Sequence, residues 1–285
     1  MDIKKILVPV DFSDTSVNAL KYATELAGKM NARLEIVHVY HITAGGDTSF
    51  FVNESMIKNQ QLVSEKKLKE LASDVPSLEN IPHAFAVEFG LTSSALLNYL
   101  DAAGIDLVVM GTKGETDILS KVVGSTTTDI INNARCPVIA IPKEARSLHW
   151  SNVAVALDKI EMDTRALKSW LSYLRQIFDC NFYVIHINET PADTNYPEQQ
   201  QDVLKQLFEE IPFHFHAVAS HSVERGLIDH MKEVEADVLM IFPRKRHIII
   251  DLFTHKVTNH LCEQLHQPIF AYRETANKEK EGSRK

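Results

Sequence analysis

The fold of this chain is decided by residues 107–142, which run LVVMGTKGETDILSKVVGSTTTDIINNARCPVIAIP. The apolar run 107–110 is too short for a helix and ends at a glycine, so it predicts a strand buried on both faces. A helix is predicted from Gly124 to about residue 134, and another short strand over residues 136–141. The stretch therefore has the strand, loop, helix and strand order of a parallel α/β protein.

The glycines of this stretch suit phosphate binding. Gly111, Gly114 and Gly124 are separated by two and nine residues. Glycine permits positive φ and lets a ligand approach main-chain N–H groups without a Cβ in the way. The helix after Gly124 starts with the hydroxyls of Ser125 and Thr126, and a helix N-terminus offers unpaired N–H donors and a favourable dipole to an anion. Taken singly, these features also occur in ordinary turns and N-caps, so that interpretation stays open.

Upstream of this stretch, predicted strands alternate with predicted helices. The strands cover residues 3–10, 34–40 and 84–88, and two of the helices cover residues 54–73 and 93–103. A further helix is capped by Ser13 or Asp14 and stops at Asn31. This order predicts a doubly wound parallel sheet, in which ligands lie at the carboxyl ends of the strands.

Three residues fall at such strand ends and are expected to lie together: Asp11, Val39 and Gly111. Asp11 has two interpretations. It bonds the first amides of the following helix, as Asp often does, or its carboxylate accepts a hydrogen bond from a bound ligand.

The second half of the chain repeats the first. After a linker at residues 143–149, residues 153–157 followed by Asp158 resemble residues 8–10 followed by Asp11, and residues 183–187 resemble 34–39. His186 takes the place of His38, and Asp237 that of Asp106. These matches predict a duplicated domain, with copies at residues 1–145 and 146–273. Residues 274–285 are polar and are expected to form a disordered tail.

The two copies differ where an anion would bind. An ungapped alignment of their last two strands pairs Gly111, Gly114, Gly124 and Ser125 with Phe242, Lys245, His255 and Lys256. Bulky side chains in place of glycines predict that the second copy does not hold a phosphate-bearing ligand in the same way.

Two groups of residues in the second half have both a functional and a structural interpretation. His214 and His216 alternate on a predicted strand and share a face, as the start of a metal site would, but no further ligand pattern joins them. A structural or surface role is the favoured interpretation. The basic run 244–246 could attract an anion, and a solvated turn is the favoured interpretation there.

Composition sets the class of protein. The 285 residues suit two globular domains, and 45% of them are hydrophobic. A net charge of -8 without a basic stripe argues against nucleic acid as a partner. Cys136, Cys180 and Cys262 lie far apart without a CxxC pair, which argues against a disulfide framework or a zinc knuckle and fits a reducing cytoplasm. Neither a signal peptide nor a membrane-spanning segment is expected, so the predicted location is cytoplasmic.

The motifs together resemble a tandem member of the universal stress protein family. The similarity runs from LVPVDFS at residues 7–13, through VHV at 37–39 and the glycine signature, to the second copy. It implies an α/β fold of two tandem, doubly wound, five-stranded parallel sheets with strand order 3-2-1-4-5, like that of the adenine nucleotide alpha hydrolases. It also implies pairing of the two domains through their last strands, residues 138–141 and 269–272. The expected arrangement is an intrachain pseudo-dimer, with a homodimer as a further possibility.

The resemblance implies an adenine nucleotide as ligand: ATP, or AMP or ADP, with Mg²⁺ or Mn²⁺ on the phosphates. The implied contacts to adenosine are Pro9, Asp11, Val39 and Met110. The implied contacts to phosphate are Gly111, Gly114, Gly124, Ser125 and Thr126. The signature is not a Walker A loop, because no Gly-Lys-Ser/Thr ends it. No side chain is predicted to be catalytic or to bind a metal directly.

The function expected from this resemblance is that of an ATP-binding regulatory protein of the stress response, with nucleotide in the first domain only. The alternatives are a nucleotide-independent adaptor that binds other proteins, and a slow ATPase. Enzymes of similar fold carry an SGGxDS loop after the first strand or a HIGH-type motif, whereas residues 11–14 here are DFSD. A binding protein is therefore expected rather than an enzyme.

Overall fold

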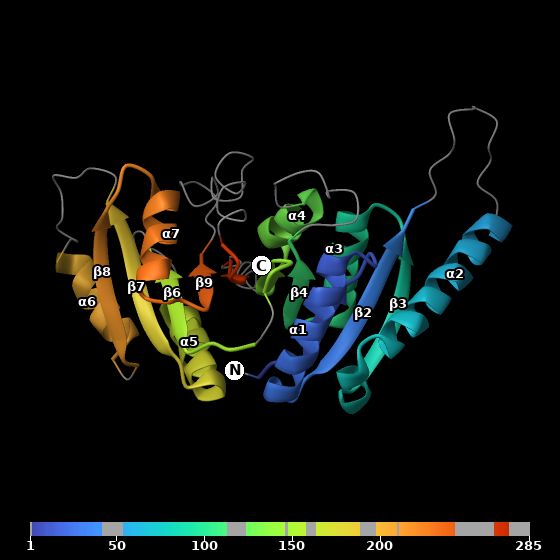
Figure 1. Ribbon diagram of the computed structural model, residues 1–285, viewed down its shortest axis with the longest axis horizontal. Coiled ribbons are helices and arrows are strands. Elements are labelled where there is room, and N and C mark those ends of the chain that lie inside the picture. Colours follow the sequence, from blue (N-terminus) through green and yellow to red (C-terminus); the bar gives the residue numbers. More distant parts are fainter. Residues whose placement is uncertain are drawn as a thin grey trace, which may run out of the picture.

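Strands and covering helices alternate along the chain in a computed structural model (Figure 1). The structure describes residues 2–41, 54–112, 124–145, 148–157, 164–188, 198–209, 211–242 and 265–273. The front and rear halves of the sequence lie side by side, with β3 and β8 toward the outer ends (Figure 1). Within these ranges, no helix combines the length and apolar character needed to cross a membrane.

Each strand and helix predicted for the front half is present, with ends that shift by a few residues. The front half comprises β1 (Lys5–Pro9), α1 (Asp14–Met30), β2 (Arg33–Tyr40), α2 (Glu54–Ser73), the 3-10 helix η1 (Pro76–Asn80), β3 (His83–Phe89), α3 (Thr92–Ala103), β4 (Leu107–Gly111), α4 (Ser125–Asn133) and β5 (Val138–Ile141). The rear half comprises β6 (Asn152–Ala156), α5 (Thr164–Phe178), β7 (Asn181–Asn188), α6 (Glu198–Leu207), β8 (Phe213–Ala219), α7 (Val223–Glu233), β9 (Val238–Ile241) and β10 (Ile269–Ala271).

The strand order confirms the predicted fold class. The order is β3-β2-β1-β4-β5 in the front half and β8-β7-β6-β9-β10 in the rear half, which is 3-2-1-4-5 in both. Strands within each half are parallel. β5 and β10 pair antiparallel, with Phe270 opposite Ile139, so the two five-stranded parts join into one ten-stranded sheet.

Two apolar layers sandwich this sheet, which explains why the central strands are continuously apolar. In β1, Ile6 and Val8 belong to the core cluster that contains buried residues of α1, α2, α5 and α6. Leu7 between them belongs to the cluster that contains buried residues of α3, α4 and α7. Because successive side chains of a strand point to opposite faces, both faces of β1 are buried.

The ends of α1 follow from its sequence. Ser13 is the N-cap, and its Oγ accepts a 3.2 Å hydrogen bond from the backbone N of Ser16. This settles the choice between Ser13 and Asp14 in favour of Ser13. Asn31 ends the helix in the left-handed conformation, with φ of 51°, as its position before β2 predicted.

Equivalent residues make the same contacts in the two halves. Asp106 Oδ2 accepts from the backbone N of Lys4 and of Lys5, both at 2.9 Å. Asp237 Oδ2 accepts from the backbone N of Ser151 at 2.7 Å and of Asn152 at 2.9 Å. The imidazoles behave alike too, because Nδ1 of His38 bonds Val10 O at 2.8 Å and Nδ1 of His186 bonds Leu157 O at 3.1 Å.

Candidate functional site

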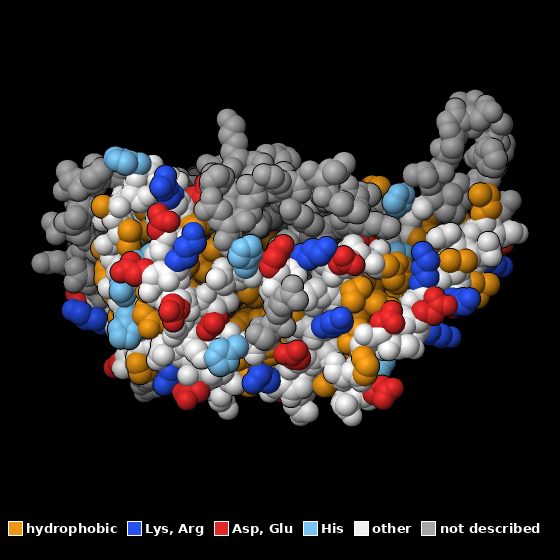
Figure 2. Space-filling view, in the orientation of Figure 1, with side chains coloured by type: hydrophobic (Ala, Val, Ile, Leu, Met, Phe, Trp, Pro, Cys, Tyr) orange, Lys and Arg blue, Asp and Glu red, His pale blue; other side chains and the backbone are white. Residues whose placement is uncertain are grey.

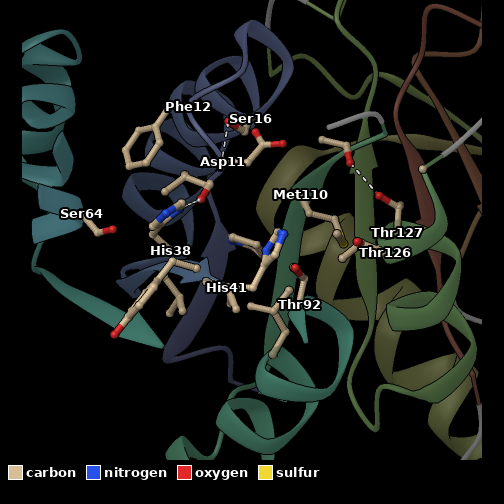
Figure 3. A pocket seen from close by; sticks show the side chains of 18 of the residues that line it. Asp11, Phe12, Ser16, His38, His41, Ser64, Thr92, Met110, Thr126 and Thr127 are labelled. Carbon is tan, nitrogen blue, oxygen red and sulfur yellow. Dashed lines mark hydrogen bonds between the residues drawn. The ribbon is translucent and has the colours of Figure 1, made fainter. Parts of the chain in front are cut away.

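A pocket of about 390 Å³ lies at the carboxyl ends of β1, β2 and β4 (Figure 3). This volume lies within the range of about 300–1,000 Å³ that is typical of small-molecule sites. Eight of the residues predicted from the sequence line it: Pro9, Asp11, Val39, Met110, Gly111, Gly124, Ser125 and Thr126. The ninth, Gly114, lies outside the described residues. The topology therefore brings remote parts of the chain to one site, as expected for a doubly wound sheet.

Asp11 anchors the loop between β1 and α1. Its Oδ1 accepts hydrogen bonds from the Oγ of Ser13 at 2.6 Å and from the backbone N of Ser13 at 3.1 Å. Its own backbone N donates to the Oγ of Ser16 at 3.3 Å. Asp11 thus orders the N-terminus of α1, as one of the two interpretations expected, and it also lines the pocket.

The other end of the pocket is the start of α4. The N-cap of this helix is Gly124, which provides no side-chain cap. The first N–H groups of a helix have no intrahelical acceptor, so a short hydroxyl-bearing first turn presents donors to an anion. Ser125, Thr126 and Thr127 of this turn line the pocket. Thr127 Oγ1 donates to Gly111 O at 2.9 Å and so ties the turn to β4.

Neither of the two described glycines of the signature has a positive φ. Gly124 has φ of -60°, and Gly111 is not among the residues with positive φ. A Cβ on Gly111 would lie 2.8 Å from Thr15 Cγ2 and 3.1 Å from the Thr15 backbone. Gly111 is therefore required for the close packing of α1 against β4, a role that the sequence analysis did not assign to it.

Sequence reasoning missed one wall of the pocket, which Phe12 and α2 form. Gln60, Ser64 and Lys67 of α2 line it, together with Phe12 and His38. Phe12 adopts φ of 69°, its ring lies 4.6 Å from the His38 ring, and Lys67 Nζ lies 5.3 Å from its centroid. The VHV motif was a usable signal for His38, which follows Val37 at the end of β2. The Lys- and Glu-rich sequence of α2 gave no indication of which face meets the site.

The rear half differs at the position equivalent to Gly111. Val108 pairs with Val138, and Leu239 pairs with Ile269, so the strand register supports the ungapped alignment that places Phe242 opposite Gly111. Phe242 is buried, with its ring 6.4 Å from that of Tyr272. The other replacements predicted to block this half, Lys245, His255 and Lys256, lie outside the described residues.

A surface ion pair involves Asp14, the first residue of α1. Lys143 Nζ donates to Asp14 Oδ2 at 2.9 Å, and this hydrogen bond, with the positive charge, holds the pKa of Asp14 below its usual value. On the coloured part of the face in Figure 2, Lys and Arg side chains are interspersed with Asp and Glu side chains. In the part of the chain that is described, no three His, Cys, Asp or Glu side chains are grouped as metal ligands.

Comparison with known proteins identifies the relatives of this chain. Residues 2–142 match the model of the universal stress protein family. Universal stress protein A homolog 1 of Coxiella burnetii is 30% identical over 144 residues, which cover 50% of this chain and 97% of that protein. A universal stress protein of Methanocaldococcus jannaschii is 29% identical over 150 residues, which cover 49% of this chain and 82% of that protein.

A solved structure extends the similarity of fold to both halves. The crystal structure of a universal stress protein from Archaeoglobus fulgidus superimposes with a TM-score of 0.73 and 16% identity, covering 93% of this chain and 97% of that one. At this identity the likeness concerns the fold alone. The sequence matches of the front half are what establish kinship, and by them this chain belongs to the universal stress protein family.

Proposed function

We propose that this chain is an ATP-binding regulatory protein of the stress response, with the nucleotide held in the front half only. One observation supports this most directly. Eight residues that the family resemblance assigns to an adenine nucleotide line a single pocket at the carboxyl ends of β1, β2 and β4. They come from sequence positions up to 117 residues apart, from Pro9 to Thr126 (126 - 9 = 117).

The chemistry of the pocket is divided in a way that suits a nucleotide. Pro9, Val39 and Met110 are apolar and would pack against the adenosine. Asp11 offers a carboxylate that would accept a hydrogen bond from a ribose hydroxyl or the adenine amino group. The N-terminus of α4 would receive the phosphates, because its N–H groups and dipole favour negative charge. In this proposal Mg²⁺ or Mn²⁺ would arrive with the phosphates.

The rear half is proposed to act as a partner domain without nucleotide. The buried Phe242 takes the position of Gly111, where the front half has no room for a Cβ against α1. The antiparallel pair of β5 and β10 supports an intrachain pseudo-dimer of two domains, residues 1–145 and 146–273. ATP occupancy in the front domain would then change partner choice or conformation, without a chemical reaction at the site.

Calorimetry with ATP and MgCl₂ on the full chain tests the proposal. Wild type is expected to bind one ATP. Gly124→Trp is expected to lose binding, because an indole at the N-cap of α4 fills the phosphate end of the pocket. Thr128→Ala is the matched control on the same helix, since Thr128 is not among the residues that line the pocket. Circular dichroism checks that all three proteins fold alike.

The outcomes separate the alternative functions. Equal ATP binding by wild type and Gly124→Trp would contradict the assigned site. No binding by wild type would favour a nucleotide-independent adaptor. ATP turnover of about 1 per second or faster would place the protein among enzymes instead. Mass spectrometry of the protein as purified provides a second measurement, because co-purified ATP or AMP supports the proposal.

A further inference from the structure

A cluster of imidazoles lies on the rear half, away from the proposed nucleotide pocket. His214 and His216 alternate on the edge strand β8, and the His216 ring centroid lies 4.5 Å from that of His230 on α7. Tyr183 of β7 stacks on His214 at 5.1 Å and lies 6.0 Å from His216. Figure 2 shows His side chains at the left of the molecule, over the region of β8 and α7.

His230 is the buried member of this cluster, with 5% of its surface exposed. Its Nδ1 lies 2.9 Å from Glu233 Oε2, within hydrogen-bonding distance. Its Nε2 is buried and has no hydrogen-bond partner among the described residues. Buried polar atoms in proteins are nearly always paired, so the unpaired Nε2 of His230, in a ring packed against that of His216, is a candidate ligand atom.

The front half has different residues at the same positions. Ala86 is the counterpart of His216, because Ala86 lies opposite Val37 in β2 and His216 lies opposite the equivalent residue of β7, Ile185. By the same register, Ala84 is the counterpart of His214. Tyr99 is the counterpart of His230, because each lies seven residues before the aspartate that the two halves share, Asp106 or Asp237 (106 - 99 = 237 - 230 = 7). Tyr99 Oη donates a 3.2 Å hydrogen bond to Glu35 Oε2, so the polar side chain at this position of the front half has a partner within the protein. The imidazoles are thus a feature of the rear half.

We propose that His216 and His230 bind a divalent transition-metal ion of the Zn²⁺ class, with Glu233 orienting the His230 ring. Imidazole nitrogens are preferred ligands of Zn²⁺, Cu²⁺ and Ni²⁺. A metal-binding histidine typically bonds a carboxylate through its other nitrogen, which fixes the tautomer and leaves the free nitrogen for the metal. Glu233, Nδ1 and the unpaired Nε2 of His230 reproduce this arrangement.

The surroundings of His216 are compatible with metal binding. Its side chain is partly exposed, which gives an ion a route from solvent and leaves positions open for water or an external ligand. With two protein ligands the site is an open one, consistent with the lack of a group of three ligands among the described residues.

Zn²⁺ calorimetry on the metal-stripped full chain, without nucleotide, tests the site. Wild type is expected to bind one equivalent of Zn²⁺. His216→Ala and His230→Tyr are expected to lose this binding. Both variants use residues that the front half carries at the same positions, Ala86 and Tyr99, so they are compatible with the fold. Glu233→Gln is expected to weaken Zn²⁺ binding by about 10–100-fold.

His83→Ala is the matched control, since it removes a partly buried imidazole from β3, the other edge strand. It is expected to retain the Zn²⁺ equivalent. Circular dichroism of the metal-free proteins checks their folding. The proposal is overturned if wild type binds no Zn²⁺, or if His216→Ala and His230→Tyr bind the same equivalent as wild type. ATP binding by the front half is a separate measurement, so either proposal can fail alone.

Discussion

The indole Nε1 of Trp150 donates a 2.6 Å hydrogen bond to the hydroxyl of Tyr22, across 128 residues of sequence. Both side chains are buried, at 2% and 3% exposure. Tyr22 belongs to α1, and Trp150 lies two residues before the first residue of β6, where its ring also stacks on Phe178 of α5 at 4.6 Å. Burial raises the pKa of Tyr22 well above its ordinary value, so the hydroxyl stays protonated. This bond therefore ties the front half to the start of the rear half.

Tyr22→Phe is expected to lower the free energy of unfolding by about 1–3 kcal/mol, because it leaves the buried Trp150 N–H without an acceptor. Urea unfolding followed by circular dichroism measures it. A cycle with Trp150→Phe and the double variant is expected to show a coupling energy of about 0.5–3 kcal/mol. Additive effects of the two changes would show that the hydrogen bond does not link the halves energetically.

The contact that Asp106 and Asp237 make in the same way in the two halves gives a second prediction. Asp106→Ala removes an acceptor that holds the backbone N of Lys4 and Lys5, and Asp237→Ala does the same for Ser151 and Asn152. Each is expected to cost about 1.5–3 kcal/mol, as for hydrogen bonds to a charged group. Urea unfolding of each variant provides the value.

Asp101→Ala is the control for both aspartates. Asp101 pairs with Arg135 at 3.7 Å on the surface, where both side chains are more than half exposed. Such exposed pairs contribute about 0–1 kcal/mol, so its loss is expected to be nearly neutral. Equal effects of Asp101→Ala and Asp106→Ala would contradict a special role for the repeated contact.

The fold could be predicted because its signals are local. The continuous apolar runs of β1 and β4 reflect burial on two faces, and caps such as Ser13 and Asn31 mark helix ends through their own side chains or backbone. The positions at strand ends follow from this topology, which is why residues as remote as Asp11 and Gly111 could be expected to lie together.

The features that could not be predicted depend on how helices pack against strands, and a single sequence does not reveal this packing. The pocket wall formed by Gln60, Ser64 and Lys67 depends on how α2 is rotated against β2 and β3. The pairing of His216 with His230 depends on the placement of α7 over β8. His214 and His216 were recognised as sharing a face, but their third neighbour lay on another element.

Gly111 has a packing role that the sequence did not reveal. Gly111→Ala is expected to destabilise the protein by about 1–3 kcal/mol, because the new Cβ would lie 2.8 Å from Thr15 Cγ2 in a tightly packed contact. Gly28→Ala, a matched change within α1, puts a Cβ at an ordinary 3.5 Å from Ile81 Cδ1 and is expected to stabilise by about 0.5–1 kcal/mol. Thermal and urea unfolding measure both, and an equal loss in the two variants would contradict this packing argument.

The lowered pKa of His216 predicts a pH dependence of stability. The facing groups are His230 and Glu233 of α7, His214 of β8 and Tyr183 of β7, and burial is the largest cause of the shift. Because the folded protein takes up this proton less readily than the unfolded chain, the unfolded state binds more protons below about pH 6.5, the ordinary value of histidine. Stability is therefore expected to fall as pH drops below 6.5.

Thermal unfolding of wild type and His216→Ala between pH 5 and 8, with a chelator present, isolates this contribution. Well above pH 6.5 the ring is neutral in both the folded and unfolded states, so the difference between the two proteins is expected to level off toward pH 8. Below pH 6.5, wild type is expected to lose stability faster than His216→Ala, because only wild type must leave this imidazole unprotonated to remain folded. A difference that stays constant over the whole range would contradict the burial of His216 against the His230 ring.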